Sequence, residues 1–183
     1  MRYCRRLAPL AAAALATLAA AAPAQAGVTA CSSSTAAAEP TPATVDQVQR
    51  TVLCLVNRER TSRGLKRLRS SSKLAKAAAG HSRDMVRRGY FDHVSPSGGT
   101  MQDRIKPTGW FSGARSFAFA ENLAWGSGQL GSPKRIVEGW MNSAGHRRNI
   151  LNRRYRELGV GVAVGTPEND DGATYTTNFG FKG

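Results

Sequence analysis

Three polar side chains, His93, Glu121 and His146, are the candidates for chemistry in this sequence. His93 lies in the turn-rich segment "YFDHVSPSGG", which can expose an imidazole. Glu121 is the only charge between Arg115 and Lys134 and lies in an apolar stretch, so its carboxylate needs hydrogen-bonding or cationic partners. His146 lies in "WMNSAGHRRNIL" and could be a ligand, an acid–base group or a packing residue. Glu121 could equally be a structural hydrogen-bonding centre.

Other polar residues favour structural roles. His81 falls on the apolar face of a predicted helix, which is typical of a hydrogen-bonded packing residue. Glu138 lies about 200° around a helix from Trp140 and is expected to point outward. Ser143 and His146 lack the orienting carboxylate and the elbow motif of a serine hydrolase, so Ser143 is expected to bond to nearby backbone. The segment "ENDDG" lacks the spacing of a calcium loop and indicates a turn.

The first residues predict export. Residues 1–26 have a basic start, an apolar alanine-rich stretch and a small-x-small ending, "PAQA", which together are typical of a signal peptide. The apolar stretch is too short for an ordinary membrane span, and no later segment approaches one. We therefore expect a secreted protein with no transmembrane segment after cleavage. The minor alternative is a lipoprotein anchored at Cys31, because "VTAC" resembles a lipoprotein cleavage box.

Cleavage after Ala26 would remove 26 of 183 residues and three arginines, leaving 157 residues, one domain's worth, and lowering the net charge from +14 to +11. It would also leave two cysteines, Cys31 and Cys54, which in an oxidising compartment most simply form one disulfide. That pairing argues against a cysteine nucleophile, which needs a free thiolate. A lipid on Cys31 would break it.

A run of arginines follows His146, beginning with Arg147 and Arg148 and continuing with Arg153, Arg154 and Arg156. Guanidinium groups suit phosphate and carboxylate, so the run could bind an anionic lipid or an acidic cell-wall polymer. Export makes nucleic acid an unexpected partner despite the charge. A solvated charged face is the alternative.

The elements that would position these residues are helices first and a hairpin last. Residues 27–43 are rich in Ser, Ala, Thr and Pro and predict a flexible arm before a single domain, 44–183. Apolar spacing predicts helices from Thr44, with Gln47 completing a capping box, to near Gly64, and at about 72–88, 100–106 and from Ser132-Pro133 to Ala144-Gly145. The runs "LGVGVAVG" and "ATYTTNFGF" predict a hairpin. This order indicates an α+β fold with helices packed on a small antiparallel sheet.

Five motifs in order resemble the CAP superfamily (SCP-like proteins), which includes cysteine-rich secretory proteins, antigen 5 and pathogenesis-related class 1 proteins. They are "LVNRERTSRGLKRL", "LAKAAAGHSRDMVRRGYFDHVSP", "AENLAWG", "WMNSAGHRRNIL" and "LGVGVAV…YTTNFG". In this form the motifs resemble the bacterial branch of the family. The resemblance implies an α-β-α sandwich, an extracellular location and a shallow polar cleft.

In eukaryotic relatives this cleft carries two histidines and two glutamates that sometimes hold a divalent metal. His93 matches the first histidine and Glu121 the glutamate of "ENLA", whereas Ser143 stands at the second glutamate and Ala173-Thr174 at the second histidine motif. His146, three residues after Ser143, could approach the space of the missing glutamate. His93, Glu121 and His146 would then supply ligands for a weak, open Zn²⁺ site.

The sequence leaves two functions open. The first is a secreted binding module at the cell envelope or outside it, which binds lipid or acidic polymer with Arg147 and Arg148 as an anion-binding rim and acts as a monomer. The second is a metal-assisted, peptidase-like hydrolase that uses His93, Glu121 and His146, with Glu121 as general base or ligand. Fold alone does not choose between them, because function belongs to the site.

Overall fold

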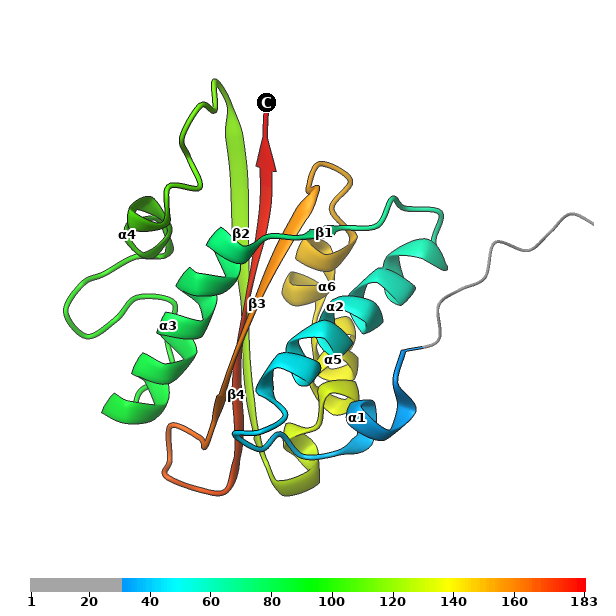
Figure 1. Ribbon diagram of the computed structural model, residues 1–183, viewed down its shortest axis with the longest axis vertical. Coiled ribbons are helices and arrows are strands. Elements are labelled where there is room, and N and C mark those ends of the chain that lie inside the picture. Colours follow the sequence, from blue (N-terminus) through cyan, green and yellow to red (C-terminus); the bar gives the residue numbers. More distant parts are fainter. Residues whose placement is uncertain (1–30) are drawn as a thin grey trace, which may run out of the picture.

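A computed structural model describes residues 31–183 and places one four-stranded sheet between two layers of helices (Figure 1). The expected signal peptide, 1–26, and the start of the expected arm lie outside the described residues. The helices are α1 (Ser33–Ala37), α2 (Val45–Thr61), α3 (Ser72–Arg88), α4 (Met101–Ile105), α5 (Pro133–Asn142) and α6 (Ala144–Leu151), with short 3-10 turns η1 (Lys106–Thr108) and η2 (Gly128–Gly131). The strands are β1 (Arg69–Ser70), β2 (Phe117–Ser127), β3 (Glu157–Val164) and β4 (Gly172–Lys182).

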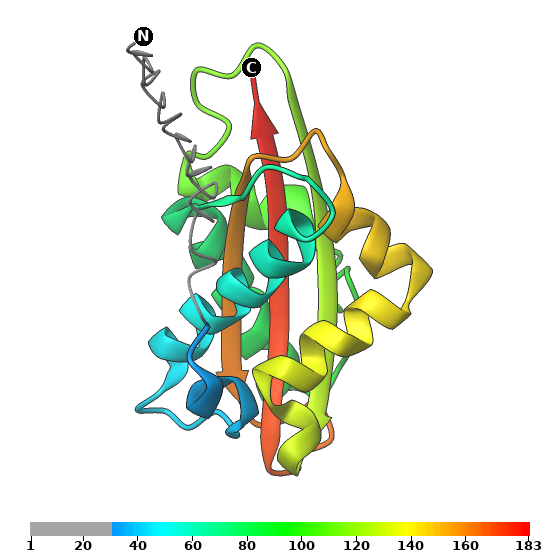
Figure 2. The ribbon, with the colours of Figure 1, turned by 90° about the vertical axis from the view of Figure 1, so that its right-hand side faces the viewer.

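The layers are those of an α-β-α sandwich. Helices α3 and α4 cover one face of the sheet, and α1, α2, α5 and α6 cover the other (Figures 1 and 2). The predicted α+β class and sandwich are confirmed. No helix within residues 31–183 is long and apolar enough to cross a membrane.

The sheet has the order β1-β3-β4-β2 and is antiparallel in its three long strands. The two-residue β1 adds a parallel pairing to β3, so the sheet is mixed rather than purely antiparallel. Two residues carry no periodicity, which is why β1 was not predicted. Strand β2 was not predicted either, because its large apolar residues alternate with alanines and both of its faces read as apolar.

Two boundaries differ from the prediction. Ala144-Gly145 does not end a helix but begins α6, because Ser143 takes an extended conformation and its carbonyl accepts the first bond of a new helix from Arg147 N at 2.9 Å. The expected capping box at the start of α2 is also absent: the Thr44 hydroxyl bonds to Thr41 instead, and Gln47 Nε2 donates to Thr35 Oγ1 at 2.6 Å.

The bond from Gln47 reaches Thr35, which lies in a segment that is more ordered than expected. Within the expected arm, residues 33–37 form α1, whose Thr35 and Ala36 are buried against α2 and α5. The predicted disulfide is present between Cys31 and Cys54, with Cα atoms 5.7 Å apart, and it fixes the start of this segment to α2. Residues 33–37 of the expected arm thus form a helix in the structure, where local packing and one cross-link offset the ordering cost.

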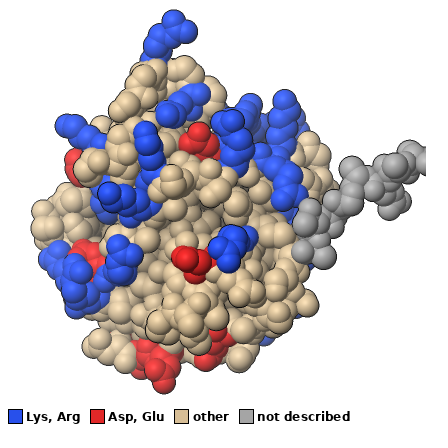
Figure 3. All heavy atoms as spheres, viewed as in Figure 1, with Lys and Arg blue, Asp and Glu red and all other residues tan. Residues whose placement is uncertain are grey.

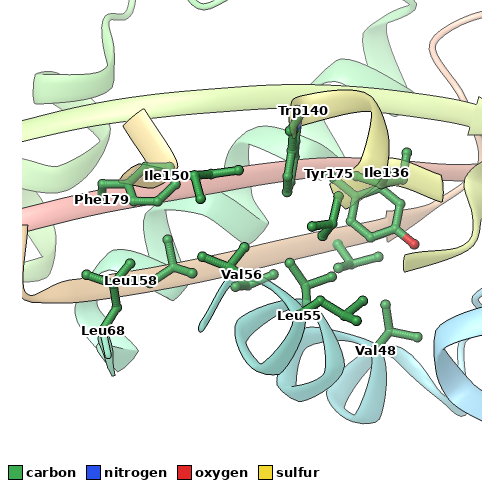
Figure 4. Packing of buried hydrophobic residues seen from close by; sticks show 14 of the residues in the cluster. Val48, Leu55, Val56, Leu68, Ile136, Trp140, Ile150, Leu158, Tyr175 and Phe179 are labelled. Atoms are coloured by element: carbon green, nitrogen blue, oxygen red, sulfur yellow. The ribbon is translucent and has the colours of Figure 1, made fainter. Parts of the chain in front are cut away.

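Apolar packing holds each helical layer to the sheet. The larger cluster joins α2, α5 and α6 to the sheet through residues such as Val56, Trp140, Ile150, Tyr175 and Phe179 (Figure 4). On the other face α3 approaches β3 closely, since a Cβ added at Gly159 or Gly161 would lie 2.2 Å from the α3 backbone. Glycine is needed at these positions because no side chain fits between strand and helix.

Candidate functional site

His93 is held in place by the helix before it. Helix α3 ends at Gly89, whose φ of +62° turns the chain toward the next segment. His81, buried in α3, donates from Nε2 to the carbonyl of Asp92 at 2.9 Å, one residue before His93. Burial, and next the Arg104 charge, lower the pKa of His81. The prediction of a hydrogen-bonded packing histidine is confirmed, and its bond positions the loop of the candidate site.

Glu121 is the buried centre of the site. It lies on β2, and its side chain is 3% exposed. Arg104 Nη2 donates to Oε1 at 3.0 Å and to Oε2 at 2.9 Å, while His93 Nδ1 lies 2.9 Å from Oε1. The carboxylate therefore has both the cation and the hydrogen bonds that its burial requires.

Arg104 is the site residue that the sequence analysis missed. It lies on α4, a short helix begun by a capping box between Thr100 and Asp103. Besides binding Glu121, its Nη1 donates to the carbonyls of His93 at 3.0 Å and Gly99 at 3.1 Å. The available signal was the need of Glu121 for a cation, but nothing in the spacing pointed to this arginine among the many in the chain.

These contacts set the protonation of His93. The hydrogen bond to Glu121 raises the pKa of His93 above its ordinary value, although burial opposes the shift. Its side chain is 56% exposed, so the imidazole can meet a ligand in solution while Nδ1 faces Glu121. Protonated His93 is a positively charged group at the mouth of the site.

His146 reaches the site from the opposite helical layer. It lies on α6, beside the edge strand β2 (Figure 2). Asn122 Nδ2 donates to the His146 carbonyl at 3.1 Å, and Asn149 Nδ2 donates to Asn122 Oδ1 at 2.8 Å. Burial, and next the His93 charge, lower the pKa of His146. The two imidazoles are thus electrostatic neighbours, whereas the direct contact is between His93 and Glu121.

The three predicted zinc ligands do not form a ligand cluster in this structure. Within residues 31–183, no three side chains of the types His, Cys, Asp and Glu gather closely enough to hold an ion. Both Glu121 oxygens already accept bonds from Arg104, and His93 Nδ1 is directed at the same carboxylate. Thr174 is fully buried and its hydroxyl donates to the Gly165 carbonyl at 2.9 Å, so it offers the cleft no ligand.

A groove of about 560 Å³ adjoins His146. Its lining includes Leu123, Trp125, Trp140, Ser143 and His146, so apolar walls meet polar groups at one end. Trp140 is fixed by a bond from Nε1 to the Leu123 carbonyl at 2.9 Å. Such a combination is typical of a ligand-binding groove.

The predicted rim residues, Arg147 and Arg148, are exposed on α6 just after His146. Arg147 Nη1 donates to the Met141 carbonyl at 2.8 Å, which holds its guanidinium beside the turn between α5 and α6. Glu138 is partly exposed and forms ion pairs with Lys134 and Arg135 on its own helix, in keeping with its predicted outward direction.

Comparisons with known proteins agree with this geometry. The family model described as "CAP: Cysteine-rich secretory protein family" matches residues 53–179. The uncharacterized protein YkwD of Bacillus subtilis is 37% identical over 139 residues, 75% of this chain and 49% of that protein. The uncharacterized membrane protein YlbC of the same bacterium is 39% identical over 132 residues, 72% of this chain and 34% of that protein. The chain spans half or less of the length of these curated relatives.

Solved structures give the same result. An extracellular protein containing an SCP domain from Bacillus anthracis is 33% identical, with a TM-score of 0.63 over 78% of this chain and 44% of that one. An outer surface protein of Borrelia burgdorferi is 21% identical, with a TM-score of 0.62 over 76% of this chain and 96% of that one, and shows the shared fold. The match to the family model, the bacterial relatives and the sandwich agree: this chain belongs to the cysteine-rich secretory protein (CAP) family.

Proposed function

We propose that this chain is an exported binding module of the cell envelope, whose cleft holds an anionic group of a lipid or an acidic polymer. The observation that carries the proposal is the state of Glu121, whose two oxygens are both engaged by Arg104 while His93 binds one of them. With that charge paired, we propose that the cleft mouth presents His93 and His146, with the exposed Arg147 and Arg148 following His146 on α6 as its rim. These are donors and cations, which suit a phosphate or carboxylate.

Export and envelope association rest on three supports. The sequence of residues 1–26 has the features of a signal peptide. Similar proteins are described as extracellular or as an outer surface protein. The net charge of +11 that remains after loss of the three arginines of residues 1–26 would draw the chain to acidic envelope material.

Retention of purified residues 27–183 on immobilised acidic wall polymer tests the proposal. Retention should fall as salt rises, because exposed charges are screened. Arg147→Glu with Arg148→Glu should weaken it about tenfold or more, since each reversal replaces an attraction by a repulsion. Arg87→Glu with Arg88→Glu, an adjacent exposed pair on α3, is the matched control. Equal retention by the rim variant and the wild type would reject this rim.

The alternative, a metal-assisted hydrolase, would need Glu121 as a base or ligand. Glu121 would first have to leave Arg104, at the cost of an unpaired buried cation. We therefore expect no hydrolysis of peptide or wall substrates by the purified chain. Hydrolysis that is abolished by a chelator and by Glu121→Ala would overturn the binding proposal in favour of the enzyme.

A further inference from the structure

One end of the sheet carries the basic loops together with an exposed aromatic side chain, Phe117. Strands β2 and β3 begin there and β4 ends there, as the pairings of Phe117 with Lys182 and of Glu157 with Gly180 require. The loops at this end are 62–68, 109–116 and 152–156 (Figure 1). We call this surface the basic–aromatic end. The opposite end has the β3–β4 turn, with exposed Glu168, Asp170 and Asp171.

Seven exposed cations lie on two neighbouring segments of this end. Residues 62–69 and 152–156 are joined by Arg60, a 1% exposed arginine whose Nε donates to the Lys66 carbonyl at 2.9 Å. Arg60 Nη1 donates to the carbonyls of Ile150 at 2.6 Å and Asn152 at 3.0 Å. The cations thereby held side by side are Arg63, Lys66, Arg67, Arg69, Arg153, Arg154 and Arg156.

Few carboxylates neutralise this group. Arg63 pairs with Glu59 and Arg69 lies 3.7 Å from Glu157, whereas the other five have no ion pair within residues 31–183. The charge is therefore available to an external anion. On the face shown in Figure 3, Lys and Arg gather over the upper part and along the left side, while Asp and Glu are scattered among them and also reach the lower rim.

An apolar cluster adjoins the cations. The ring centroids of Phe111, Phe117 and Phe119 lie 4.9 to 5.9 Å apart, and Phe117 is 45% exposed. Contacts lead directly from the cluster to the basic loops: Phe111 packs on Trp110, and Trp110 Nε1 donates to Glu157, the partner of Arg69. On the other side of the sheet Arg154 stacks on Phe181.

We propose that the basic–aromatic end docks this protein on an anionic lipid bilayer, with the arginines at lipid phosphates and Phe117 at the headgroup boundary. A polymer of phosphodiesters would use the cations but give no reason for the exposed Phe117 at the edge of the phenylalanine cluster, whereas a bilayer interface uses both. The proposal rests on the envelope location proposed above and concerns a surface separate from the Arg147–Arg148 rim. In this docking, the β3–β4 turn with its acidic residues faces away from the membrane.

Sedimentation of residues 27–183 with vesicles tests this docking. Vesicles of phosphatidylcholine with about a third phosphatidylglycerol should bind the chain, and pure phosphatidylcholine should bind it far less. Lys66→Glu with Arg67→Glu and Arg153→Glu should lower the affinity about 100-fold, since each cation near an anionic surface contributes roughly a factor of five. The matched control reverses three exposed cations elsewhere: Arg50→Glu, Lys76→Glu and Arg83→Glu.

The aromatic contribution has its own variant. Phe117→Ser should weaken vesicle binding severalfold, and the loss should persist at high salt because it is apolar in origin. Leu130→Ser, at a 64% exposed residue at the opposite end of the sheet, is the control and should bind normally. Circular dichroism of each variant verifies the fold.

The outcomes separate the two surfaces. Loss of vesicle binding in the end variants, with wall-polymer retention kept, supports docking by the basic–aromatic end even where the rim proposal fails. If vesicle binding is lost in the rim variant (Arg147→Glu with Arg148→Glu) but unchanged in the variants of the basic–aromatic end, the docking proposal is overturned. The proposed function would then still stand. Binding to a phosphodiester polymer without any binding to vesicles also overturns it.

Discussion

Arg104 and Glu121 determine what the cleft can do at the scale of single residues. The Glu121 carboxylate, on a 3% exposed side chain, is paired with the guanidinium of Arg104, whose side chain is 15% exposed. Because Arg104 occupies both oxygens of Glu121, this carboxylate is not free to act as a general base. The hydrogen bond from His93 to the same carboxylate raises the pKa of His93. Two measurements follow from this local chemistry.

Arg104→Met should destabilise the fold by about 3 kcal/mol, because it leaves a buried charge without its partner. Chemical unfolding at neutral pH measures the change. The double variant Arg104→Met with Glu121→Leu should recover much of the loss, since it removes both charges. A single variant as stable as the wild type would show that the pair is not needed.

The His93 pKa provides the second measurement. Nuclear magnetic resonance titration should find it above that of His146, whose pKa is lowered by burial. Glu121→Gln should lower the His93 pKa, and an unchanged value would contradict the assigned bond. Because the folded-state pKa is raised, the stabilisation by His93 is full below the unfolded-state pKa and is lost as pH rises through the folded value. The stability gap between wild type and His93→Gln should therefore narrow as pH rises from the unfolded-state pKa of histidine, about 6.5, through the raised folded-state value.

At the scale of elements, glycines let α3 lie directly on the sheet. Gly159 and Gly161 face the α3 backbone, which a Cβ would approach to 2.2 Å. This close contact places His81 of α3 where its Nε2 can donate to the Asp92 carbonyl, and that bond positions the loop of His93 near β2. The close packing of α3 on the sheet therefore also fixes the position of the His93 loop at the cleft.

Gly161→Ala should destabilise the protein by about 3 kcal/mol or prevent folding, because backbone atoms would have to move. Thermal unfolding measures this. Gly139→Ala is the control, since Gly139 lies in α5 with nothing within 4 Å of an added Cβ. Alanine there should be neutral or stabilising by up to about 1 kcal/mol. Equal effects at both positions would refute the close-contact explanation.

The disulfide acts on α1 and α2. It spans 23 residues, so its loss should cost about 3 kcal/mol through the entropy of the unfolded chain. Cys31→Ser with Cys54→Ser should show this in chemical unfolding. Mass spectrometry of the purified chain should find two free thiols only after reduction, and free thiols before reduction would contradict the pairing.

Helices were the elements that the sequence predicted best. Helix α3 was predicted at 72–88 and is found at Ser72–Arg88, because an apolar stripe and a terminal glycine specify it locally. Strand β2 was missed because its pairing with β4 is a tertiary property and its own pattern is apolar on both faces. Family motifs placed His93 and Glu121 together, but only the fold brings Arg104 from α4 to them.

At the scale of the whole molecule, a group of seven exposed cations lies at one end of the sheet and the acidic β3–β4 turn lies at the other. A net charge of +14 can be read from the composition, but not its concentration on loops that are distant in sequence and joined by Arg60. Burial, and next the nearby Arg156 charge, lower the pKa of Arg60, which is a sign of repulsion within this group. A surface assembled for binding an anion thus works against the stability of the free protein.

That conflict can be measured as a dependence on salt. At low ionic strength, Lys66→Glu with Arg67→Glu and Arg153→Glu should raise the unfolding temperature by about 2–4 °C, since relief of repulsion is worth about 1 kcal/mol. The gain should vanish in about 0.5 M salt, where the screening length is a few ångströms. The control variant with Arg50→Glu, Lys76→Glu and Arg83→Glu should gain less, because its cations are dispersed over α2 and α3. If the two triple variants shift equally, the gain comes from the lower net charge alone and the basic–aromatic end has no special repulsion.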